Sequence, residues 1–404
     1  MATKKKKTIT SVLFNKGAMD IPFFCILMTI VTIGLIMLFS ASYTYSYYFR
    51  TSSSELFIRQ LIFAAIGIVG MFVVSRIRFE YFKAISFIAA GVSVALLILV
   101  RMLPDSVQPG FYRWINLGFI TFQPSEIAKI GLIMFLAFCL EQHHKSVVGK
   151  SPSDLNVCIS IEEKTGLVLK KSFTTTIAYG LVILLFAVLV LIENHVSGAV
   201  LMLAIGVIML FLGEVNNKWF VLAVIIAVFG VILFVLNPDI LKEYAGERIV
   251  AWLDKDYEPL GARWQTNNSL YAIGSGGFLG TGLGQSKQKH LYVSEPQNDF
   301  IFSIVCEELG FVGATAIIIL FALLVYRGIK IGLRAKDRFG ALLAMGIVFQ
   351  VGVQVALNIA VVSDFIPNTG ISLPFFSYGG TSLVILLCEM GMVLSVSRSA
   401  RKKD

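Results

Sequence analysis

The sequence predicts an all-α, polytopic membrane protein with ten transmembrane helices. Of its 404 residues, 56% are hydrophobic and 15% are charged, whereas soluble domains average about 45–50% apolar and about 25% charged residues. A membrane helix needs about 20 mostly apolar residues. Ten segments meet this requirement: 21–43, 57–76, 83–103, 125–142, 173–192, 196–213, 219–237, 299–326, 340–362 and 378–396.

The first of these segments follows the basic run Lys4–Lys7 and so imitates a signal peptide. It extends from Ile21 to about Ser40, which is longer than the roughly 7–15 apolar residues of a signal peptide. We therefore expect an uncleaved first membrane helix, with cleavage near Ser40 as the alternative. The apolar segments leave no room for a large soluble domain. The predicted units are a basic cytoplasmic arm (1–20), a single transmembrane domain (21–396) and a basic cytoplasmic tail (397–404).

The positive charges predict the orientation of the chain. With both termini cytoplasmic, the inside segments hold 23 of the 34 Lys and Arg residues, as the positive-inside rule requires. The net charge of +9 is thus explained by membrane topology, and no nucleic-acid partner is expected. This orientation places the loop 238–298, between helices 7 and 8, outside the cell. A loop of this length exceeds ordinary connections, and such loops are usually functional or disordered; its Trp residues and glycines favour an ordered one.

Two basic residues flank the start of the fourth predicted helix. Pro124, Ser125 and Glu126 are typical of a first helical turn, where Pro fits and an acid suits the helix dipole. Arg113 precedes this turn and Lys129 follows it. A planar guanidinium and a point charge together suit a phosphate or pyrophosphate. A buried Glu126–Lys129 pair is the structural alternative.

Two glycine-rich segments indicate unusual backbone. Residues 274–284 contain six glycines, which allow the backbone to approach a ligand or another segment closely. No strand–turn–helix context accompanies them, so a dinucleotide site is excluded, and a tightly packed turn is the alternative. Residues 366–382 contain two prolines and three glycines beside apolar residues. Irregular backbone near a membrane needs protein or a cavity to supply hydrogen-bond partners, although a simple loop and helix start would also fit.

Three acids lie at or near the start of the eighth predicted helix. Asp299 is placed where the polar loop becomes apolar, and Glu307 and Glu308 follow two to three turns later. Acids in membrane segments are costly and normally face the protein interior or a watery cavity. On one continuous helix, Asp299 and Glu307 would share a broad face. We expect a functional role for Asp299, whereas internal ion pairing is the simpler explanation for Glu307 and Glu308.

Together these motifs resemble the SEDS family (shape, elongation, division and sporulation), which comprises FtsW, RodA and SpoVE. The resemblance covers nearly the whole chain in the right order. Its motifs are RWINLG with FQPSE and Lys129 (113–129), GSGGFLGTGLG (274–284), SEPQNDFIFSIVCEELG (294–310) and IPNTGISLPFFSYGGTS (366–382). The family implies a ten-helix bundle that polymerises lipid II into glycan strands outside the cytoplasmic membrane. It also implies a class B penicillin-binding protein as the partner that crosslinks the strands.

The resemblance implies roles for particular residues. Asp299 would be the catalytic base for the 4-hydroxyl of the GlcNAc of lipid II, in one inverting displacement that gives a β1,4 bond. Arg113 and Lys129 would stabilise the undecaprenyl pyrophosphate, directly or with a divalent cation (Mg or Mn), and no tightly bound cofactor is expected. The residues expected to bind the substrate are Arg113, Gln123, Ser125, Glu126, Lys129, Gly276, Gly277, Ser377, Tyr378, Gly379 and Gly380.

The chain departs from the family pattern in two places. The family often has Gln-Pro-Asp-Leu-Gly-Thr between helices 5 and 6, where residues 193–198 read Glu-Asn-His-Val-Ser-Gly. Residues 297–298, before Asp299, read Gln-Asn, where many members have His-Thr. The first departure puts the role of the family Asp in doubt, because His195 stands in its place. It favours a division-type, FtsW-like member.

Two other functions remain alternatives. A lipid II flippase would also need a polar cavity and interrupted helices, but we would expect its acids near the middle of the membrane. A non-catalytic scaffold for other divisome or elongasome membrane proteins would explain the loops, but it would not require Asp299, Arg113 and Lys129 together. The crowding of polar motifs on the predicted outer face favours the polymerase.

Overall fold

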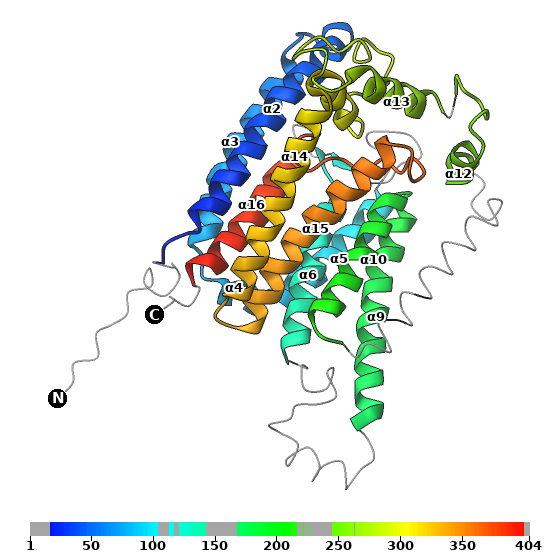
Figure 1. Cartoon of the computed structure of the whole chain (residues 1–404). Helices are drawn as coiled ribbons and strands as arrows, with labels where there is room; N and C mark the ends of the chain where they lie inside the picture. The colour runs from blue at the N-terminus through cyan, green and yellow to red at the C-terminus, as the bar shows by residue number, and fades with distance from the viewer. Residues whose placement is uncertain are drawn as a thin grey trace.

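The computed structural model describes residues 17–103, 113–116, 121–142, 168–215, 221, 225, 245–261 and 263–399. These residues form a bundle of long helices that run side by side (Figure 1). The helices are α2 (Ile21–Phe49), α3 (Glu55–Arg76), α4 (Phe79–Ala84), α5 (Ser86–Met102), α6 (Pro124–Gln142), α9 (Val168–Ile192), α10 (Val196–Leu212), α12 (Ala245–Leu253), α13 (Trp264–Gly276), α14 (Ile301–Leu333), α15 (Arg338–Val362) and α16 (Gly380–Arg398). Strand β1 (Ile115–Asn116) pairs antiparallel with β2 (Thr121–Phe122).

The helix starts follow from local sequence. Asp20 caps α2, because its side chain accepts a hydrogen bond of 3.0 Å from the backbone N–H of Phe23, and Pro22 fits the first turn. Asp337 caps α15 in the same way through the N–H of Gly340, at 2.8 Å. These caps satisfy backbone donors that a helix leaves without partners.

The protein is a multi-pass membrane protein. Within the described residues, five helices are long and apolar enough to cross a membrane: α2, α3, α14, α15 and α16. Helices α5 and α10 and the segment Thr176–Ile192 of α9 are shorter and also apolar. The predicted seventh helix, 219–237, lies outside the described residues except for two positions.

Several predicted helix boundaries are wrong; α2, for example, extends to Phe49, beyond the predicted end at residue 43. The predicted helix 83–103 is divided between α4 and α5, which separate at Ile85. The predicted helix 299–326 begins later and ends later, since α14 spans Ile301–Leu333. Asp299 therefore precedes the helix, and the face that it was expected to share with Glu307 on a continuous helix does not exist.

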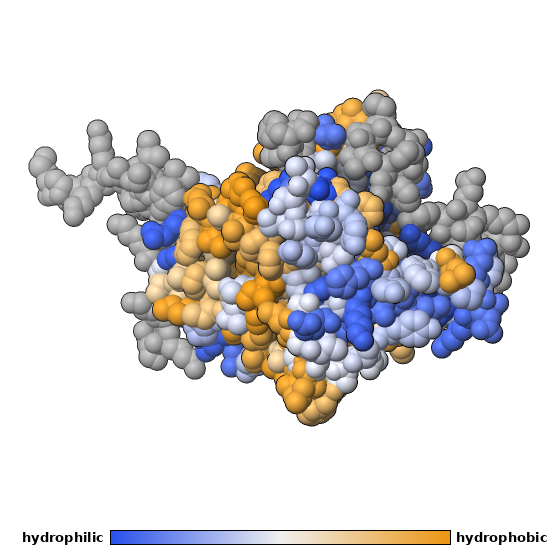
Figure 2. Space-filling view, turned by 90° about the horizontal axis from the view of Figure 1, so that it is seen from above, coloured by the Kyte–Doolittle hydropathy of each residue, from blue (hydrophilic) through white to orange (hydrophobic). Residues whose placement is uncertain are grey.

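The ends of the described chain meet at one end of the bundle. Arg398 donates from Nη1 to the carbonyl oxygen of Gly17 at 2.8 Å, and the N–H of Asp20 donates to Oγ of Ser397 at 3.1 Å. Helices α12 and α13 lie at the opposite end (Figure 1). Seen from above, hydrophilic residues cover part of that end, whereas apolar residues extend along the side of the bundle (Figure 2).

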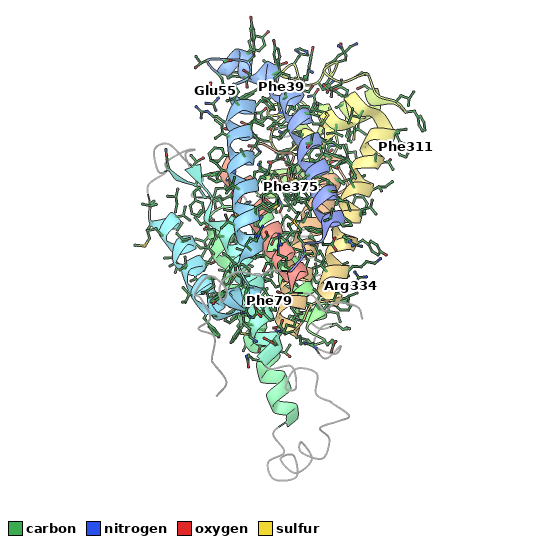
Figure 3. All side chains as sticks on the ribbon, turned by 90° about the vertical axis from the view of Figure 1, so that its left-hand side faces the viewer. Phe39, Glu55, Phe79, Phe311, Arg334 and Phe375 are labelled. Atoms are coloured by element: carbon green, nitrogen blue, oxygen red, sulfur yellow. The ribbon has the colours of Figure 1, made fainter. Side chains whose placement is uncertain are left out.

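A kink in α14 accommodates the first glycine-rich segment. Gly310 has φ 66°, which an L-residue adopts only with strain. A Cβ atom on Gly310 would lie 2.2 Å from the backbone nitrogen of Gly280. Beside the kink, Phe311 points away from the bundle, whereas Phe375 lies inside it (Figure 3). The predicted alternative of a tightly packed turn describes this segment.

Candidate active site

Asp299 lies in the turn before α14 and is held from two sides. Its backbone oxygen accepts a hydrogen bond of 2.7 Å from Nδ2 of Asn358 on α15, and the same amide donates to the carbonyl oxygen of Ile371 at 2.6 Å. Gly370, with φ 71°, lies so close that a Cβ atom there would be 3.1 Å from Oδ2 of Asp299. The carboxylate is therefore packed directly against the irregular segment 366–379.

That segment is fixed to the residues before Asp299. Ser377 donates from Oγ to the carbonyl oxygen of Asn298 at 2.8 Å. The backbone N–H of Tyr378 donates to the carbonyl oxygen of Gln297, also at 2.8 Å. Gln60 of α3 binds the same segment, because its side chain donates to Ser377 and accepts from the N–H of Gly379. Helices α3 and α15 thus fix the irregular segment and the turn that holds the carboxylate, which satisfies the expectation that irregular backbone finds protein partners.

Burial and the neighbouring charges together determine the pKa of Asp299. Burial raises the pKa of Asp299 from its ordinary 3.8 to about 6. Nearby Arg113 and Arg248 oppose this rise in pKa, while Glu295 adds to it. Two guanidinium groups from distant segments therefore act on one carboxylate. Arg113 was predicted from the sequence; Arg248, in the short helix α12, was not, and only the amphipathic pattern of residues 245–253 could have drawn attention to it.

A second polar group lies beside Arg113 in the turn between α9 and α10. Nδ1 of His195 is 3.2 Å from Nε2 of Gln123. Burial, Arg113 and Lys129 lower the pKa of His195 to about 3, so the ring is neutral at physiological pH. Glu193 is fully buried, and burial raises its pKa to about 9 against the opposing charge of Arg113. The residue in place of the family Asp thus contacts a predicted substrate-binding residue, Gln123.

Lys129 lies in a small pocket and is already paired. Its Nζ is 2.9 Å from Oε2 of Glu126 and 3.3 Å from Oε1 of Gln354, and its side chain is 5% exposed. Gln354 in turn donates to the carbonyl oxygen of Ser372 at 3.0 Å. The predicted Glu126–Lys129 pair is therefore present. The pocket is lined by Glu126, Lys129, Gln354, Ser372, Leu373, Pro374, Phe375, Ser377, Tyr378, Gly379, Ser382, Leu383 and Leu386.

The remaining predicted residues occupy other places. Gly276 and Gly277 lie at the end of α13. A Cβ on Gly276 would be 2.0 Å from the carbonyl oxygen of Cys306, and the carbonyl oxygen of Gly277 accepts a hydrogen bond of 2.9 Å from the N–H of Phe311, so both glycines contact α14. Gly380 begins α16 and packs against Phe63. Ser125 is buried in the first turn of α6, and its hydroxyl has no partner among the described residues.

Glu307 and Glu308 hold the loop that leads to Asp299. Glu308 pairs with Lys289 at 2.9 Å and accepts from the hydroxyl of Ser40 at 2.7 Å. Glu307 accepts from the backbone N–H of Lys287 at 2.8 Å. The predicted internal ion pairing is confirmed for Glu308, whereas Glu307 is satisfied by hydrogen bonds. The Lys289 partner, 19 residues away, could not be identified from the sequence pattern.

Comparisons with known proteins give a consistent result. A family model described as "Cell cycle protein", FTSW_RODA_SPOVE, matches residues 21–402. Stage V sporulation protein E of Bacillus subtilis (strain 168) is 37% identical over 96% of this chain and 99% of its own length. The probable peptidoglycan glycosyltransferase FtsW of Geobacter sp. (strain M18) is 34% identical, over 91% of this chain and 94% of its own.

Solved structures show the same fold. A chain from a peptidoglycan synthase complex that coordinates polymerization and crosslinking superposes with a TM-score of 0.71 at 24% identity, covering 94% of this chain and 98% of that one. The rod shape determining protein RodA of Thermus thermophilus superposes with a TM-score of 0.65 at 24% identity, covering 96% and 99%.

Proposed function

Because this chain belongs to the FtsW, RodA and SpoVE family, we propose that it is a peptidoglycan glycosyltransferase that polymerises lipid II into β1,4-linked glycan strands. Relatives that align over most of its length are named probable peptidoglycan glycosyltransferases. The observation that carries the proposal is the Asp299 carboxylate, whose turn is held by Asn358 of α15 and which lies close to the charges of Arg113 and Arg248.

In the proposed reaction Asp299 is the general base. The C1–O bond between the donor sugar and its pyrophosphate breaks, and C1 forms a bond to the 4-hydroxyl oxygen of the acceptor. The hydroxyl proton passes to Asp299, and the pyrophosphate leaves with the bonding electron pair. A pKa of about 6 leaves Asp299 ionised at neutral pH, yet basic enough to accept the proton. Such a base typically contributes about 10²–10⁴-fold to the rate. One base without a nucleophile agrees with a single inverting displacement.

Cations stabilise the departing pyrophosphate. Arg113 acts on the same carboxylate that receives the proton, and a guanidinium can bind phosphate oxygens with two parallel hydrogen bonds. Lys129 adds positive charge in the neighbouring pocket with Glu126. Gln123 immediately precedes α6 and Ser125 lies in its first turn, one turn before Lys129. The carbonyls and hydroxyls of the 377–380 segment complete the substrate contacts. Gly276 and Gly277 contact α14, so they would affect substrate binding only through the conformation of the loop that follows them.

A divalent cation, Mg²⁺ or Mn²⁺, would enter with the substrate. Among the residues that the structure describes, no group of three or more His, Cys, Asp and Glu side chains could hold a metal ion. Mg²⁺ is commonly bound by one or two carboxylates together with substrate phosphates. Such a cation would therefore be carried by the pyrophosphate oxygens, which leaves the Asp299 carboxylate free to act as the base. When bound, such an ion would neutralise charge on the leaving group.

We further propose the complete topology. Ten helices within residues 21–396 cross the cytoplasmic membrane, and both termini, 1–20 and 397–404, are cytoplasmic. Two observations support this. The described chain ends meet at one end of the bundle, and α12 and α13 lie at the other. Asp299 then faces the outside, where lipid II, the nascent undecaprenyl-linked glycan and a class B penicillin-binding protein would be met. The cellular role is division or growth of cell shape, together with other divisome or elongasome membrane proteins.

Reconstitution tests the proposed activity. The purified protein, in complex with its penicillin-binding protein, is given fluorescent lipid II in detergent. We expect polymer that a muramidase digests, because that enzyme cleaves β1,4 bonds. In parallel, proteoliposomes report whether lipid II crosses the bilayer. Absence of polymer from every active-complex preparation, together with rapid lipid II scrambling, would establish the flippase alternative instead.

A further inference from the structure

We infer that Arg248 of α12 is a second cation for the donor pyrophosphate, which would bind it together with Arg113 beside Asp299. This inference rests on the proposed function, since it names a further substrate-binding residue of the same site. Neither the glycine-rich motifs nor the predicted basic residues include Arg248. Four observations carry it: the anchoring of α12, the hydrogen bond that orients Arg248, the effect of its charge on Asp299, and the ion pair that already engages Lys129.

Helix α12 is firmly attached to the segment that follows α15. Nη2 of Arg263 is 2.7 Å from Oδ2 of Asp364, and both side chains are at most 8% exposed. Arg263 also donates to the carbonyl oxygen of Ala251 in α12. Trp252 donates from Nε1 to the carbonyl oxygen of Asp364 at 3.1 Å. A buried ion pair with additional hydrogen bonds gives a defined geometry, so the position of α12 on this segment is fixed.

Arg248 reaches the immediate surroundings of the Asp299 carboxylate. Its Nη1 donates to the carbonyl oxygen of Asn368 at 3.1 Å. The side chain of Asn368 accepts from the N–H of Gly370 at 3.3 Å, and Gly370 packs against Oδ2 of Asp299. Only Thr369 therefore lies between the residue whose carbonyl orients Arg248 and the glycine that packs against the base. A guanidinium presents five N–H donors in a planar fork, so one bond to a carbonyl can orient it toward a phosphate.

The charges support this placement. Among the residues that the structure describes, Arg113, Arg248 and Glu295 are charged groups that act on the pKa of Asp299. Both arginines lower its pKa, so both lie close enough to stabilise negative charge at this position. The ammonium group of Lys129, by contrast, lies 2.9 Å from Oε2 of Glu126 and is already engaged in that ion pair. The developing charge of the leaving group would thus meet two guanidinium groups, which suit phosphate oxygens better than an ammonium already paired with a carboxylate does.

The test compares Arg248→Gln and Arg248→Lys with the control Lys255→Gln. Lys255 is an exposed cation just beyond α12 and lies outside the proposed site. The full-length protein in complex with its penicillin-binding protein is assayed for lipid II polymerisation, and for inhibition by inorganic pyrophosphate at a fixed concentration of free Mg²⁺. Protection by pyrophosphate against thermal unfolding is measured separately, because it needs no turnover.

We expect Arg248→Gln to raise the inhibition constant of pyrophosphate at least about 10-fold, as loss of a charge-assisted bidentate contact would. The acid limb of the pH profile should also move to higher pH, because the cation that lowers the pKa of Asp299 is gone. Arg248→Lys should give a smaller increase, about 3-fold or more, because a point charge cannot replace the fork. Lys255→Gln should behave as the wild type.

An unchanged inhibition constant in folded Arg248→Gln would overturn the inference and leave Arg248 with a purely structural contact to Asn368. If Arg248→Gln fails to fold, Arg248→Lys decides, since a wild-type inhibition constant there refutes the bidentate contact. Failure of the proposed function gives a different result. The wild type would then form no polymer, while pyrophosphate would still protect it in an Arg248-dependent manner.

Discussion

The pH dependence of polymerisation reports directly on the environment of Asp299. With a pKa of about 6, the carboxylate is about 97% ionised near pH 7.5 and about 9% ionised near pH 5 by simple titration. Because the base must be ionised to accept a proton, kcat/KM should fall about 10-fold over this interval. An Asp with its ordinary pKa of 3.8 would still be about 94% ionised near pH 5, and the rate would barely change.

The assay is the initial rate of lipid II polymerisation, measured at low substrate so that it gives kcat/KM of the free enzyme. His195 and Glu193 do not titrate in this interval, because their pKa values are about 3 and about 9. Arg113→Gln removes a cation that lowers the pKa of Asp299, so its acid limb should lie at higher pH. Asp256→Asn, which changes an exposed acid, should leave the profile unaltered. A flat rate between about pH 5 and pH 7.5, or an acid limb that Arg113→Gln does not move, would refute this reasoning.

Three further predictions concern the groups around the base. Gly370→Ala places a Cβ atom 3.1 Å from Oδ2 of Asp299 at φ 71°. We expect about 1 kcal/mol of backbone strain and a polymerisation rate at least about 10-fold lower. A variant whose thermal unfolding and rate both match those of the wild type would contradict this prediction. Lys289→Met leaves Glu308 buried without its partner at 2.9 Å, which should reduce the free energy of unfolding by about 3–5 kcal/mol; denaturation in detergent measures this, and a loss below about 1 kcal/mol would contradict the ion-pair assignment. Lys129→Met leaves Glu126 without its ion-pair partner and should lower both stability and turnover, and unchanged donor affinity and rate would remove Lys129 from the proposed site.

Much of the fold follows from local sequence. Runs of about 20 apolar residues locate the membrane helices, and the i,i+3 spacing of Glu126 and Lys129 predicts an ion pair that the structure contains. The boundaries were less predictable. Hydropathy alone extends the eighth helix back to residue 299, yet Asp299 remains in a turn because Asn358 of α15 binds its backbone oxygen. No local pattern encodes that contact.

The candidate site was predicted only in part, because some of its residues are brought together by contacts that no local pattern encodes. Asp299 and Arg113 stand out as charges beside apolar segments, and the structure brings both together with Arg248. Arg248 belongs to a long polar loop in which a single arginine is unremarkable by sequence. Its position depends on Arg263 and Asp364, which are 101 residues apart in the chain. Tertiary contacts of this separation are invisible to periodicity and composition.

The most direct test of the account is the polymerisation rate of Asp299→Asn in complex with its penicillin-binding protein. The amide keeps the shape of the side chain but cannot accept the hydroxyl proton, so we predict a rate about 10²–10⁴-fold below the wild type. The melting temperature should be equal or higher, because a charge that burial disfavours has been removed. Asp256→Asn is the matched control and should retain the full rate. Polymerisation by Asp299→Asn at the wild-type rate would contradict the central claim that this carboxylate is the catalytic base.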